Sequence, residues 1–600
     1  MSAISGKRRR TLAALVAALA GVVLLPAAAG ATSHGPFPDP LGDPTDTSEA
    51  WSQADEIRAR VRPPTFPELD VDVTAFGADL TGREKSTDAF RLAIAAAHTA
   101  GGGRVVVPAG TYLTGAIHLR SNVNLHLEES SVVSFSTDKA DFLPVVKTRF
   151  EGVELYNYSP FNYAYQAENI AVTGSGVLDG QAAADNWWDW KRTPAPGGGV
   201  LETADRNALL RMGEEGVPVA ERVFGAGHFL RPNFVQFYES RNILLQGVTL
   251  NNSPMWLVHP VRSENVTVDG VTLESLGPNN DGVNPESSRD VVIKNTRFNT
   301  GDDCIAIKSG RNAEGRRIGI PSENILIEDN LMQAGHGAVV AGSEMSGGVR
   351  NVFAQNNVMN SPDLDRVVRV KTNSLRGGVV ENIYVRDNDV PQQRGQVVWV
   401  DFFYEEGDAG DFTPVVRNIY VEDLHSSGGT HALYLRGYAR SPVTNITISD
   451  SSFDGVATPM LLQNVQGLRL SGVTINGSRA DSVVCQGSVW LGVPEVLIDS
   501  GVADRRVGEW CLSEQFQEEY DWTSAGVFDA YVARVTADLH DAGLITDAER
   551  QALLEAARQT DIGTGWRNEA PCVQTQSSSS CHRPARRTPT GPRAIPCPTW

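Results

Sequence analysis

A short motif recurs along most of the chain: a polar residue, usually Asn, then an apolar, a variable and a second apolar residue. Successive copies lie 23 to 36 residues apart, with no long apolar helix pattern between them. They begin at Asn242, Asn265, Asp290, Asn324, Asn351, Asn382, Asn418 and Asn445, with earlier copies at Asn122 and Asn169. A fixed repeat of this kind predicts a solenoid in which each coil packs only on its neighbours.

Each copy alternates apolar and other residues as a short β-strand does, and turn residues bound it. A shortest period near 23 residues fits a coil of about three strands, with longer steps carrying loops at the corners. The Asn before each strand can then hydrogen-bond to its counterparts in the stacked coils. A leucine-rich horseshoe is the alternative, but its L-x-x-L-x-L pattern is missing. We therefore expect an all-β chain with a right-handed parallel β-helix over residues 67–512.

Helices are expected at both ends of this solenoid. Residues 87–97 read as one amphipathic helix, which would cap the open apolar end of the first coil. Residues 513–566 read as a helical hairpin in which Phe528 and Val532 share a face and Thr546 begins a capping box. This hairpin either packs on the coil or is a small attachment module. The Ser-, Pro- and Arg-rich tail, residues 567–600, has the composition of a disordered segment.

The N-terminus is typical of an exported protein. Residues 1–31 contain a basic start, a short apolar run and a small-residue end, which predicts a cleaved signal peptide rather than an uncleaved anchor. An arginine pair leaves a twin-arginine route open beside the general one. Residues 32–66 form a Pro- and Asp-rich leader, expected to be loose. The mature protein is then secreted and extracellular.

Net charge limits the partners. The formal charge is −20, and −24 without residues 1–31, so nucleic acid and anionic membranes are unsuitable partners. An anionic substrate would need cations gathered at the site. Six cysteines are too few for a disulfide framework, although Cys485 and Cys511 flank one segment and can pair after export. Cys304 is expected to be a small buried residue. Oligomeric state is not indicated.

Four motifs place acidic and basic residues at coil-compatible spacing. Asp281 is followed 21 and 22 residues later by Asp302 and Asp303, which is one coil, so the three carboxylates should form one cluster. His336 follows Asp303 by 33 residues, and Arg369 with Lys371 begins 33 residues after His336. Alternate residues of a strand face one side, so Arg369 and Lys371 should project together.

Such a stripe suits cleavage of a glycosidic bond in an acidic sugar. The reaction needs one protonated carboxyl for the leaving oxygen and one ionised carboxylate. Crowding three carboxylates raises the pKa of at least one of them. The cations of Arg369 and Lys371 fit a sugar carboxylate. Single Asp-Gly or Asp-Asp pairs are ordinary turn residues, but four motifs in order are not expected from turns alone.

With these motifs the chain resembles glycoside hydrolase family 28, the polygalacturonases, over residues 70–480. The family's N-x-D, G-D-D, G-H-G and R-x-K runs stand here at 279–281, 301–303, 335–337 and 369–371, and Val370 replaces the usual isoleucine. Phe76-Gly77-Ala78 and the run 107–112 extend the resemblance toward the N-terminus. It implies a β-helix that hydrolyses galacturonan with inversion, without metal or cofactor. The helical hairpin and the tail lie outside it.

The resemblance also implies residue roles. Asp302 corresponds to the general acid, and Asp281 with Asp303 to the pair that activates water. His336 supports the acid, and Arg369 with Lys371 binds the substrate carboxylate. Further candidates for binding the substrate are Asn279, Lys308 and Trp256.

The mode of attack and two other classes of function stay open. A long insertion between Asp179 and Arg231 contains Trp187, Trp188 and Trp190, which either stack on sugars or anchor the loop. With a second aromatic and acidic loop, residues 401–411, it favours a pocket and exo attack. Alternatives are an endo-polygalacturonase or a rhamnogalacturonan hydrolase. A pectate lyase would use its carboxylates for Ca²⁺, and a non-catalytic carbohydrate-binding β-helix would bind without turnover.

Overall fold

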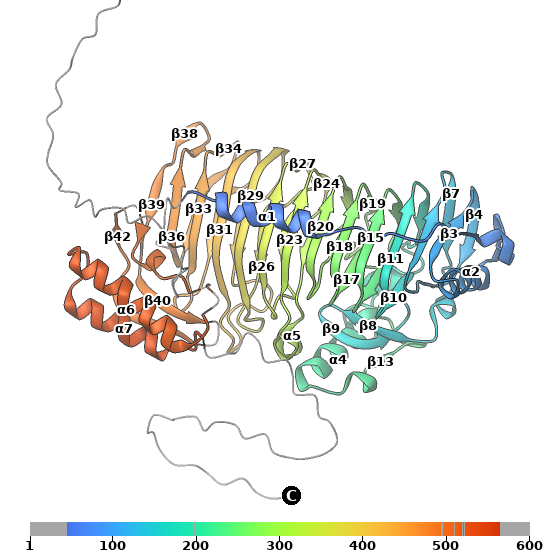
Figure 1. The fold of residues 1–600 in the computed structure, drawn as a ribbon, viewed down its shortest axis with the longest axis horizontal. Helices are drawn as coiled ribbons and strands as arrows, with labels where there is room; N and C mark the ends of the chain where they lie inside the picture. The colour runs from blue at the N-terminus through green and yellow to red at the C-terminus, as the bar shows by residue number, and fades with distance from the viewer. Residues whose placement is uncertain are drawn as a thin grey trace, which may run out of the picture. The chain divides into compact units, whose positions relative to one another are not determined.

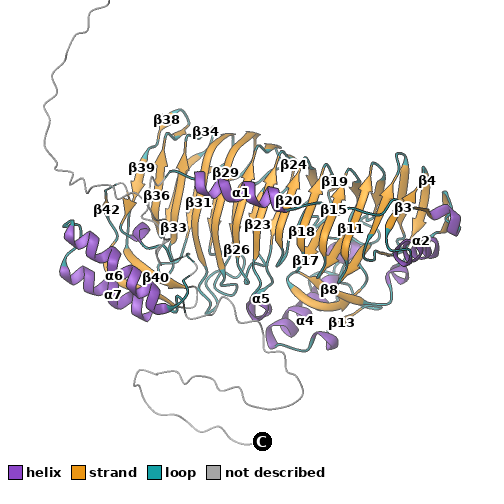
Figure 2. Cartoon of the chain, in the orientation of Figure 1, coloured by secondary structure: helices purple, strands orange, loops and turns teal. Residues whose placement is uncertain are grey.

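The computed structural model is a right-handed parallel β-helix, as the repeat predicts (Figures 1 and 2). Most strands belong to three parallel sheets that run along the solenoid, and each regular coil contributes one strand to each sheet. The structure describes residues 45–196, 198–493, 496–508, 510–518, 520 and 522–563. The expected signal peptide, residues 32–44 and the tail 567–600 lie outside the described residues.

The strands of the first sheet pair coil to coil in parallel. They are β1 (Asp70–Asp72), β3 (Gly103–Val107), β6 (Val123–Leu127), β11 (Glu168–Gly174), β15 (Arg241–Gln246), β18 (Glu264–Asp269), β20 (Arg289–Lys294), β23 (Ser322–Glu328), β26 (Val349–Gln355), β29 (Val379–Gln392), β31 (Val415–Ser427), β33 (Val443–Ser449) and β36 (Val465–Ser471).

The second sheet follows the first around each coil, and the long strands β29 and β31 enter both sheets. Its other strands are β2 (Thr81–Lys85), β4 (Gly110–Thr114), β7 (Ser131–Phe135), β12 (Val177–Asp179), β16 (Thr249–Asn251), β19 (Thr272–Ser275), β21 (Arg297–Thr300), β24 (Leu331–Ala334), β27 (Val358–Asn360), β34 (Ser452–Asp454) and β37 (Thr474–Ile475).

The third sheet carries Arg369 and Lys371, and the other motifs of the predicted site lie in the turns that lead into it. Val283 links its two halves through bridges to Val258 and Ile305. Its strands are β5 (Ile117–His118), β10 (Asn162–Tyr165), β14 (Val235–Tyr238), β17 (Val258–Val261), β22 (Ile305–Ile307), β25 (Val339–Ala341), β28 (Arg366–Lys371), β30 (Gln396–Asp401), β32 (His431–Arg436) and β35 (Thr458–Gln463). Inward-facing apolar residues of the three sheets form one continuous core.

The asparagines of the repeat form the predicted ladder. Asn242 Nδ2 donates to Asn169 Oδ1 at 2.8 Å, Asn265 Nδ2 to Asn242 Oδ1 at 2.8 Å, and Asn418 Nδ2 to Asn382 Oδ1 at 3.0 Å. These residues adopt positive φ, for example 56° at Asn242, a conformation that asparagine tolerates better than most residues. The motif therefore fixes both the corner and the stacking register.

From β15 to β27 the corner between the first and second sheets has a constant length. Two residues separate β15 from β16, β18 from β19, β20 from β21, β23 from β24 and β26 from β27. The first of the two is always Gly, Asn or Asp with positive φ, as in Gly247 and Asn295. The other corners carry the insertions.

The leader is ordered where the structure describes it, which corrects the expectation of a loose segment. Helix α1 (Ser48–Arg60) lies across the first sheet and buries Trp51, Ala54 and Ile57 against Val292, Leu326 and Phe353 (Figure 1). Arg58 Nη2 and Arg60 Nη2 reach Glu328 and Asp290 at 2.8 and 2.7 Å. The apolar face of α1 is narrow, and the residues that it packs on come from separate coils.

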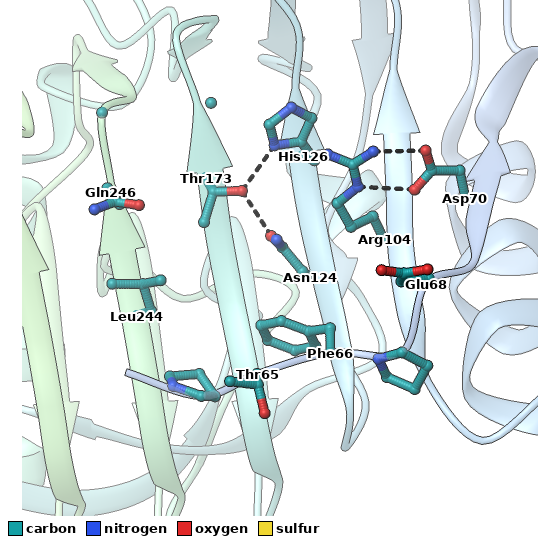
Figure 3. A pocket seen from close by; sticks show the side chains of 14 residues that line it. Thr65, Phe66, Glu68, Asp70, Arg104, Asn124, His126, Thr173, Leu244 and Gln246 are labelled. Carbon is teal, nitrogen blue, oxygen red and sulfur yellow. Dashed lines mark hydrogen bonds and ion pairs between the residues drawn. The ribbon is translucent and has the colours of Figure 1, made fainter. Parts of the chain in front are cut away.

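Beyond α1 the leader continues toward the N-terminal coils. The backbone N–H of Arg62 donates to Asn265 Oδ1 at 2.9 Å. Residues 64–68 then pass over a cavity of 950 Å³ on the first sheet, lined by Asn124, His126 and Thr173 (Figure 3). Arg104 at its edge is already paired with Asp70 at 2.6 Å, so its charge is neutralised. This cavity contains none of the predicted site residues.

Both ends of the solenoid are covered. Helix α2 (Thr87–Thr99) packs on the first coil, where the sequence predicts a cap, and the 3₁₀ turn η1 (Val73–Phe76) lies beside it. At the other end β39 (Ser482–Val484) pairs antiparallel with β36, and β38 (Ser478–Arg479) pairs antiparallel with β37. No helix of the described residues is long and apolar enough to cross a membrane.

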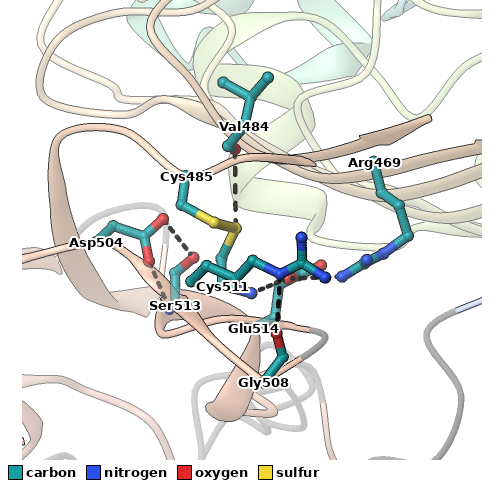
Figure 4. The surroundings of a disulfide bond; sticks show 9 residues. Arg469, Val484, Cys485, Asp504, Gly508, Cys511, Ser513 and Glu514 are labelled. Atoms are coloured by element: carbon teal, nitrogen blue, oxygen red, sulfur yellow. Dashed lines mark hydrogen bonds and ion pairs between the residues drawn. A yellow bond between two sulfur atoms is a disulfide. The ribbon is translucent and has the colours of Figure 1, made fainter. Parts of the chain in front are cut away.

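The C-terminal elements pack against the last coils. Strands β40 (Ser488–Val493) and β41 (Val496–Ala503) form a hairpin on which α7 (Asp547–Gln559) lies, with α6 (Ala525–Asp541) beside it. A disulfide joins Cys485 to Cys511, and β42 (Arg506–Val507), β43 (Trp510–Cys511) and η4 (Ser513–Gln515) surround it (Figure 4). Burial raises the pKa of the adjoining Glu514 to about 7. The helical hairpin therefore packs on β40 and β41, and its role stays open.

An insertion made of two segments, one on each side of β10–β12 in the chain, decorates the third sheet on its N-terminal half. It consists of β8 (Val146–Phe150), β9 (Val153–Asn157) and β13 (Val223–Phe224), together with η2 (Lys139–Phe142), α3 (Asp189–Arg192), α4 (Leu201–Glu215) and η3 (Val219–Glu221). Helix α5 (Asn312–Ile318) follows β22 and contacts α4. A second apolar cluster, which includes Phe150, Leu209 and Trp256, holds this insertion in place.

Candidate active site

Three carboxylates meet where the second sheet turns into the third. Asp281 precedes the bridge residue Val283, and Asp302 and Asp303 follow β21 one coil later. One oxygen from each carboxylate lies within 4.8 Å of the other two. The N–H of Gly282 donates to the Asp303 carbonyl at 2.9 Å, which keeps the two turns in register. The coil spacing thus brings the three residues together as expected.

Asn280 fixes the turn that carries Asp281. Its Oδ1 accepts from the Gly277 N–H at 2.8 Å, and its Nδ2 donates to the carbonyls of Ser253 and Met255 at 3.0 and 2.8 Å. A buried amide with these partners holds two coils at once. Burial, and then the charge of Asp302, raises the pKa of Asp281 well above its ordinary value.

Asp303 is held as an anion by two cations. Lys371 Nζ lies 2.6 Å from its Oδ2, and Arg369 Nη1 lies 2.9 Å from its Oδ1. Burial favours the neutral acid, but Lys371 and Arg369 outweigh burial and lower the pKa of Asp303 to about 2. The side chain of Asp303 is 0% exposed. Both oxygens of Asp303 therefore have a cationic partner. Arg369 and Lys371, which the sequence predicts to bind the substrate, pair with Asp303.

Asp302 and His336 form the accessible edge of the cluster. Asp302 Oδ1 accepts from the N–H of Asp303 at 2.9 Å and lies 3.1 Å from His336 Nδ1. The side chains of Asp302 and His336 are 22% and 50% exposed, far more than those of Asp281 and Asp303. The hydrogen bond that His336 donates to Asp302 raises the pKa of His336, against the opposing effect of burial.

Lys308 links the cluster to a glutamate that the sequence reasoning missed. Its Nζ lies 3.5 Å from Asp281 Oδ2 and 3.1 Å from Glu344 Oε2. Glu344 in turn accepts from Arg311 Nη1 at 3.3 Å. Glu344 lies one coil after Lys308, so placing the whole sequence in stacked register would have found it. Lys308 therefore contacts the site from within the protein.

Trp256 and Asn279 have internal partners. Trp256 is 3% exposed, and its ring lies 4.4 Å from Lys308 Nζ. It packs against that lysine, and a contact of Trp256 with the substrate stays a prediction. Asn279 Oδ1 accepts from Nη2 of the buried Arg231 at 2.8 Å, and Arg231 Nε pairs with Glu202 at 2.7 Å. Arg231 and Glu202 thereby tie the insertion to the turn of Asp281.

The aromatic residues of the insertion anchor it. Trp187 and Trp190 are buried in the main core, where Trp187 packs against Phe142 and Phe161. Trp188 Nε1 donates to the Ser253 carbonyl at 2.8 Å. Of the two interpretations open in the sequence, the structure supports anchoring for Trp187 and Trp190.

The second loop, residues 401–411, lies beside the two cations. The ring of Tyr404 is 5.7 Å from Lys371 Nζ and 5.8 Å from the Arg369 guanidinium. At the tip, Glu405 pairs with Arg376 at 2.9 Å and with Arg311 at 3.4 Å. The loop is thus fastened to the coils that carry the site.

The outward face of the third sheet is covered on the N-terminal side of the carboxylates. Gln236, His259 and Glu286 face outward, because the residues beside them in the strands are the ones that fill the core. Even so, each of the three is 0% exposed. Arg149 of β8 lies over them: its Nη1 donates to Glu286 Oε1 at 3.1 Å, and its carbonyl accepts from Gln236 Nε2 at 3.3 Å. His259 Nε2 lies 2.7 Å from Glu286 Oε2. The insertion therefore closes the sheet at this end.

Comparisons with known proteins agree with this geometry. The model of glycosyl hydrolases family 28 matches residues 226–477, which include all four motifs. A probable polygalacturonase of Vitis vinifera is 30% identical over 425 residues, covering 66% of this chain and 78% of the relative. The exo-poly-alpha-D-galacturonosidase of Dickeya chrysanthemi is 26% identical over 446 residues, covering 69% and 72%.

A solved structure matches still more closely in sequence. The crystal structure of a hyperthermoactive exopolygalacturonase from Thermotoga maritima is 46% identical, with a TM-score of 0.70. The match covers 72% of this chain and 99% of that chain.

Proposed function

Since this chain belongs to family 28 of the glycosyl hydrolases, we propose that it is a secreted polygalacturonase that removes galacturonate from the ends of pectin chains. The observation that carries the proposal is the contact of a three-carboxylate cluster with a paired arginine and lysine. Two of the relatives reported above are named as exo-acting enzymes. Pairing of Cys485 with Cys511 supports an oxidising, extracytoplasmic location.

Each member of the cluster has a role that fits its surroundings. Asp303 is fixed as an anion, and burial beside Asp302 raises the pKa of Asp281 well above its ordinary value, so a proton is retained next to Asp302. Asp302 is the more accessible of the two and faces His336, so it is the group that protonates the leaving oxygen. Asp281 and Asp303 orient the attacking water from the opposite side.

The paired cations explain how a carboxylated sugar would start the reaction. Lys371 and Arg369 occupy both oxygens of Asp303. A galacturonate carboxylate offers these cations a second partner, and sharing them releases an Asp303 oxygen for water. A neutral methyl ester competes far less well. Charge on the substrate thus contributes to catalysis as well as to binding.

Inversion follows from the lack of a spare nucleophile among the three aspartates. Asp303 is held at both oxygens, and Asp281 has a raised pKa, so neither is suited to attack the sugar carbon. One oxygen of Asp281 and one of Asp303 lie within 4.8 Å of each other, close enough to hold one water between them. Three cations beside Asp281 and Asp303 also oppose a bound Ca²⁺, as a lyase would need.

The covered end of the third sheet supports exo attack. With Gln236, His259 and Glu286 buried under β8, a polysaccharide cannot continue past the carboxylates in the N-terminal direction. A site closed on one side admits a chain end. An endo-polygalacturonase or a rhamnogalacturonan hydrolase would need room on both sides of the scissile bond.

A time course on polygalacturonate tests the proposal. Chromatography should show free galacturonate from the first minutes, with activity unchanged by EDTA and with no product absorbing in the ultraviolet. A ladder of oligomers would contradict exo attack. Unsaturated products would indicate a lyase, and binding without products would indicate a carbohydrate-binding protein. Asp302→Asn, which is expected to leave the coil intact because its side chain is partly exposed, is the matched inactive control.

A further inference from the structure

Two columns of outward-facing residues run along the third sheet from the site toward the C-terminal coils. In one column Arg369 pairs in register with Trp399, and Trp399 with Tyr434. In the other Lys371 pairs with Asp401, and Asp401 with Arg436. The cation pair at 369 and 371 is thus followed, two coils later, by Tyr434 and Arg436. At about 4.8 Å per coil they stand roughly 10 Å beyond it.

Tyr434 and Arg436 are accessible, unlike their counterparts on the covered side. Arg436 has a side chain that is 33% exposed, and Tyr434 is half-buried. In the same columns on the N-terminal side, His259 and Glu286 are 0% exposed. Substrate that extends from the carboxylates can therefore lie only over the C-terminal coils.

The chemistry of this pair suits a second uronate. The ring of Tyr434 lies beside Trp399, with centroids 6.2 Å apart and an interplanar angle of 25°, which fixes one aromatic face. The Arg436 guanidinium lies 4.0 Å from the Phe403 ring, and its Nε donates to Gln463 Oε1 at 3.0 Å. Its nearest anion, Asp401, is 3.9 Å away, longer than the Lys371–Asp303 contact. The charge of Arg436 is therefore only weakly compensated.

Asp401 does not oppose an anionic ligand here. It is 8% exposed, and its Oδ1 accepts from the N–H of Phe403 at 2.9 Å, so the carboxylate is directed to its own loop. Gln463, the next residue of the column, is exposed and neutral.

We propose that Tyr434 and Arg436 form a distal subsite that binds a galacturonate residue of the uncut polymer, Tyr434 by stacking on the sugar and Arg436 by pairing with its carboxylate. The inference rests on the proposed exo-polygalacturonase function and adds the direction in which the polymer leaves the pocket. A subsite of this kind makes the enzyme favour long chains over the shortest substrate.

The test compares substrates of increasing length. For Arg436→Gln, kcat/KM on polygalacturonate should fall roughly 3- to 10-fold, between the cost of an exposed ion pair and that of a charged hydrogen bond. For Tyr434→Ala the fall should be roughly 2- to 10-fold. Both losses should shrink toward none on digalacturonate, which is too short to reach the subsite. Tyr434→Phe keeps the ring and should retain the preference for long chains.

Arg479→Gln is the matched control, because Arg479 is an exposed arginine on β38, away from the third sheet. It should behave as wild type on every substrate. Equal losses of the Arg436 and Tyr434 variants on digalacturonate and polymer, or no loss on either, would overturn the subsite. Failure of the wild type to release galacturonate from any of these substrates would instead overturn the proposed function.

Discussion

Lys371 Nζ lies 2.6 Å from Asp303 Oδ2, so a cation expected to bind the substrate is also the partner of the proposed base. Arg369 completes the arrangement on the other oxygen. Recognition of charge and activation of water thereby depend on the same contacts.

Removal of Lys371 should change both binding and the pH dependence. Burial raises the pKa of Asp303, and Lys371 is one of the cations that lower it. In Lys371→Met this cation is gone, so the pKa of Asp303 rises from about 2. Because Asp303 must be ionised to act as the base, the acidic limb of the rate profile should move to higher pH. We expect kcat/KM to drop roughly 10- to 100-fold, the cost of a charged hydrogen bond. Rate profiles from pH 3 to 7 measure this, and Lys371→Arg should keep the wild-type acidic limb.

The same variant distinguishes substrates. On methyl-esterified oligomers, which lack the carboxylate, Lys371→Met should lose much less than on free galacturonan. Equal losses on both substrates would assign Lys371 a structural role only.

Asp302→Asn should reduce turnover by about 10²–10⁴-fold, the contribution typical of a general acid. The side chain is partly exposed, and its main partners are His336 and a backbone N–H, so the fold should persist. Circular dichroism and the melting temperature check the fold, and reducing-sugar assays measure the rate. Asp454→Asn, at an exposed aspartate of β34, should remain fully active. A near-normal rate for Asp302→Asn would remove this residue from the mechanism.

The first product should be the β-anomer. Cleavage of an α-linked galacturonan by water held between Asp281 and Asp303 inverts the anomeric carbon. Proton NMR in the first minutes, before mutarotation, follows the anomeric signals. An initial α-anomer, or a covalent sugar trapped on any of the three aspartates, would contradict the roles proposed for them.

Helix α1 should stabilise the solenoid without affecting catalysis. Trp51 is 6% exposed and packs on Phe353 and Arg386. Trp51→Ala should cost about 3–5 kcal/mol of unfolding free energy, as for other buried tryptophans. Thermal and denaturant unfolding measure the loss, with Ser52→Ala on the exposed face of α1 as control. An unchanged midpoint would show that α1 packs without adding stability.

The sequence was sufficient for those features that repeat from coil to coil. The position of the asparagines, the clustering of Asp281 with Asp302 and Asp303, and the common face of Arg369 and Lys371 all follow from the period of the coil and the alternation of a strand. These properties depend only on neighbouring residues in a strand or on the repeat from one coil to the next, so no knowledge of side-chain packing was needed.

Features that depend on packing between distant segments were not predictable in this way. The apolar face of α1 has only Trp51, Ala54 and Ile57, and its partners are spread over three coils. The pairing of Asp303 with both cations depends on side-chain reach across coils of unequal length. The burial of Trp256 depends on β8 and α4, which fold back from other parts of the chain.

The constant two-residue corner has a consequence for how such a protein can change. One extra residue there would move an Asn or Gly out of its left-handed position and shift the register of every strand stacked above it. The corners that border the third sheet already accommodate whole helices and hairpins. In the coils from β15 to β27, length variation is therefore confined to the side of the solenoid that meets the substrate, and the reach and selectivity of the site can diversify while the frame stays fixed. Insertion scanning of the two kinds of corner would reveal this asymmetry as opposite patterns of tolerance.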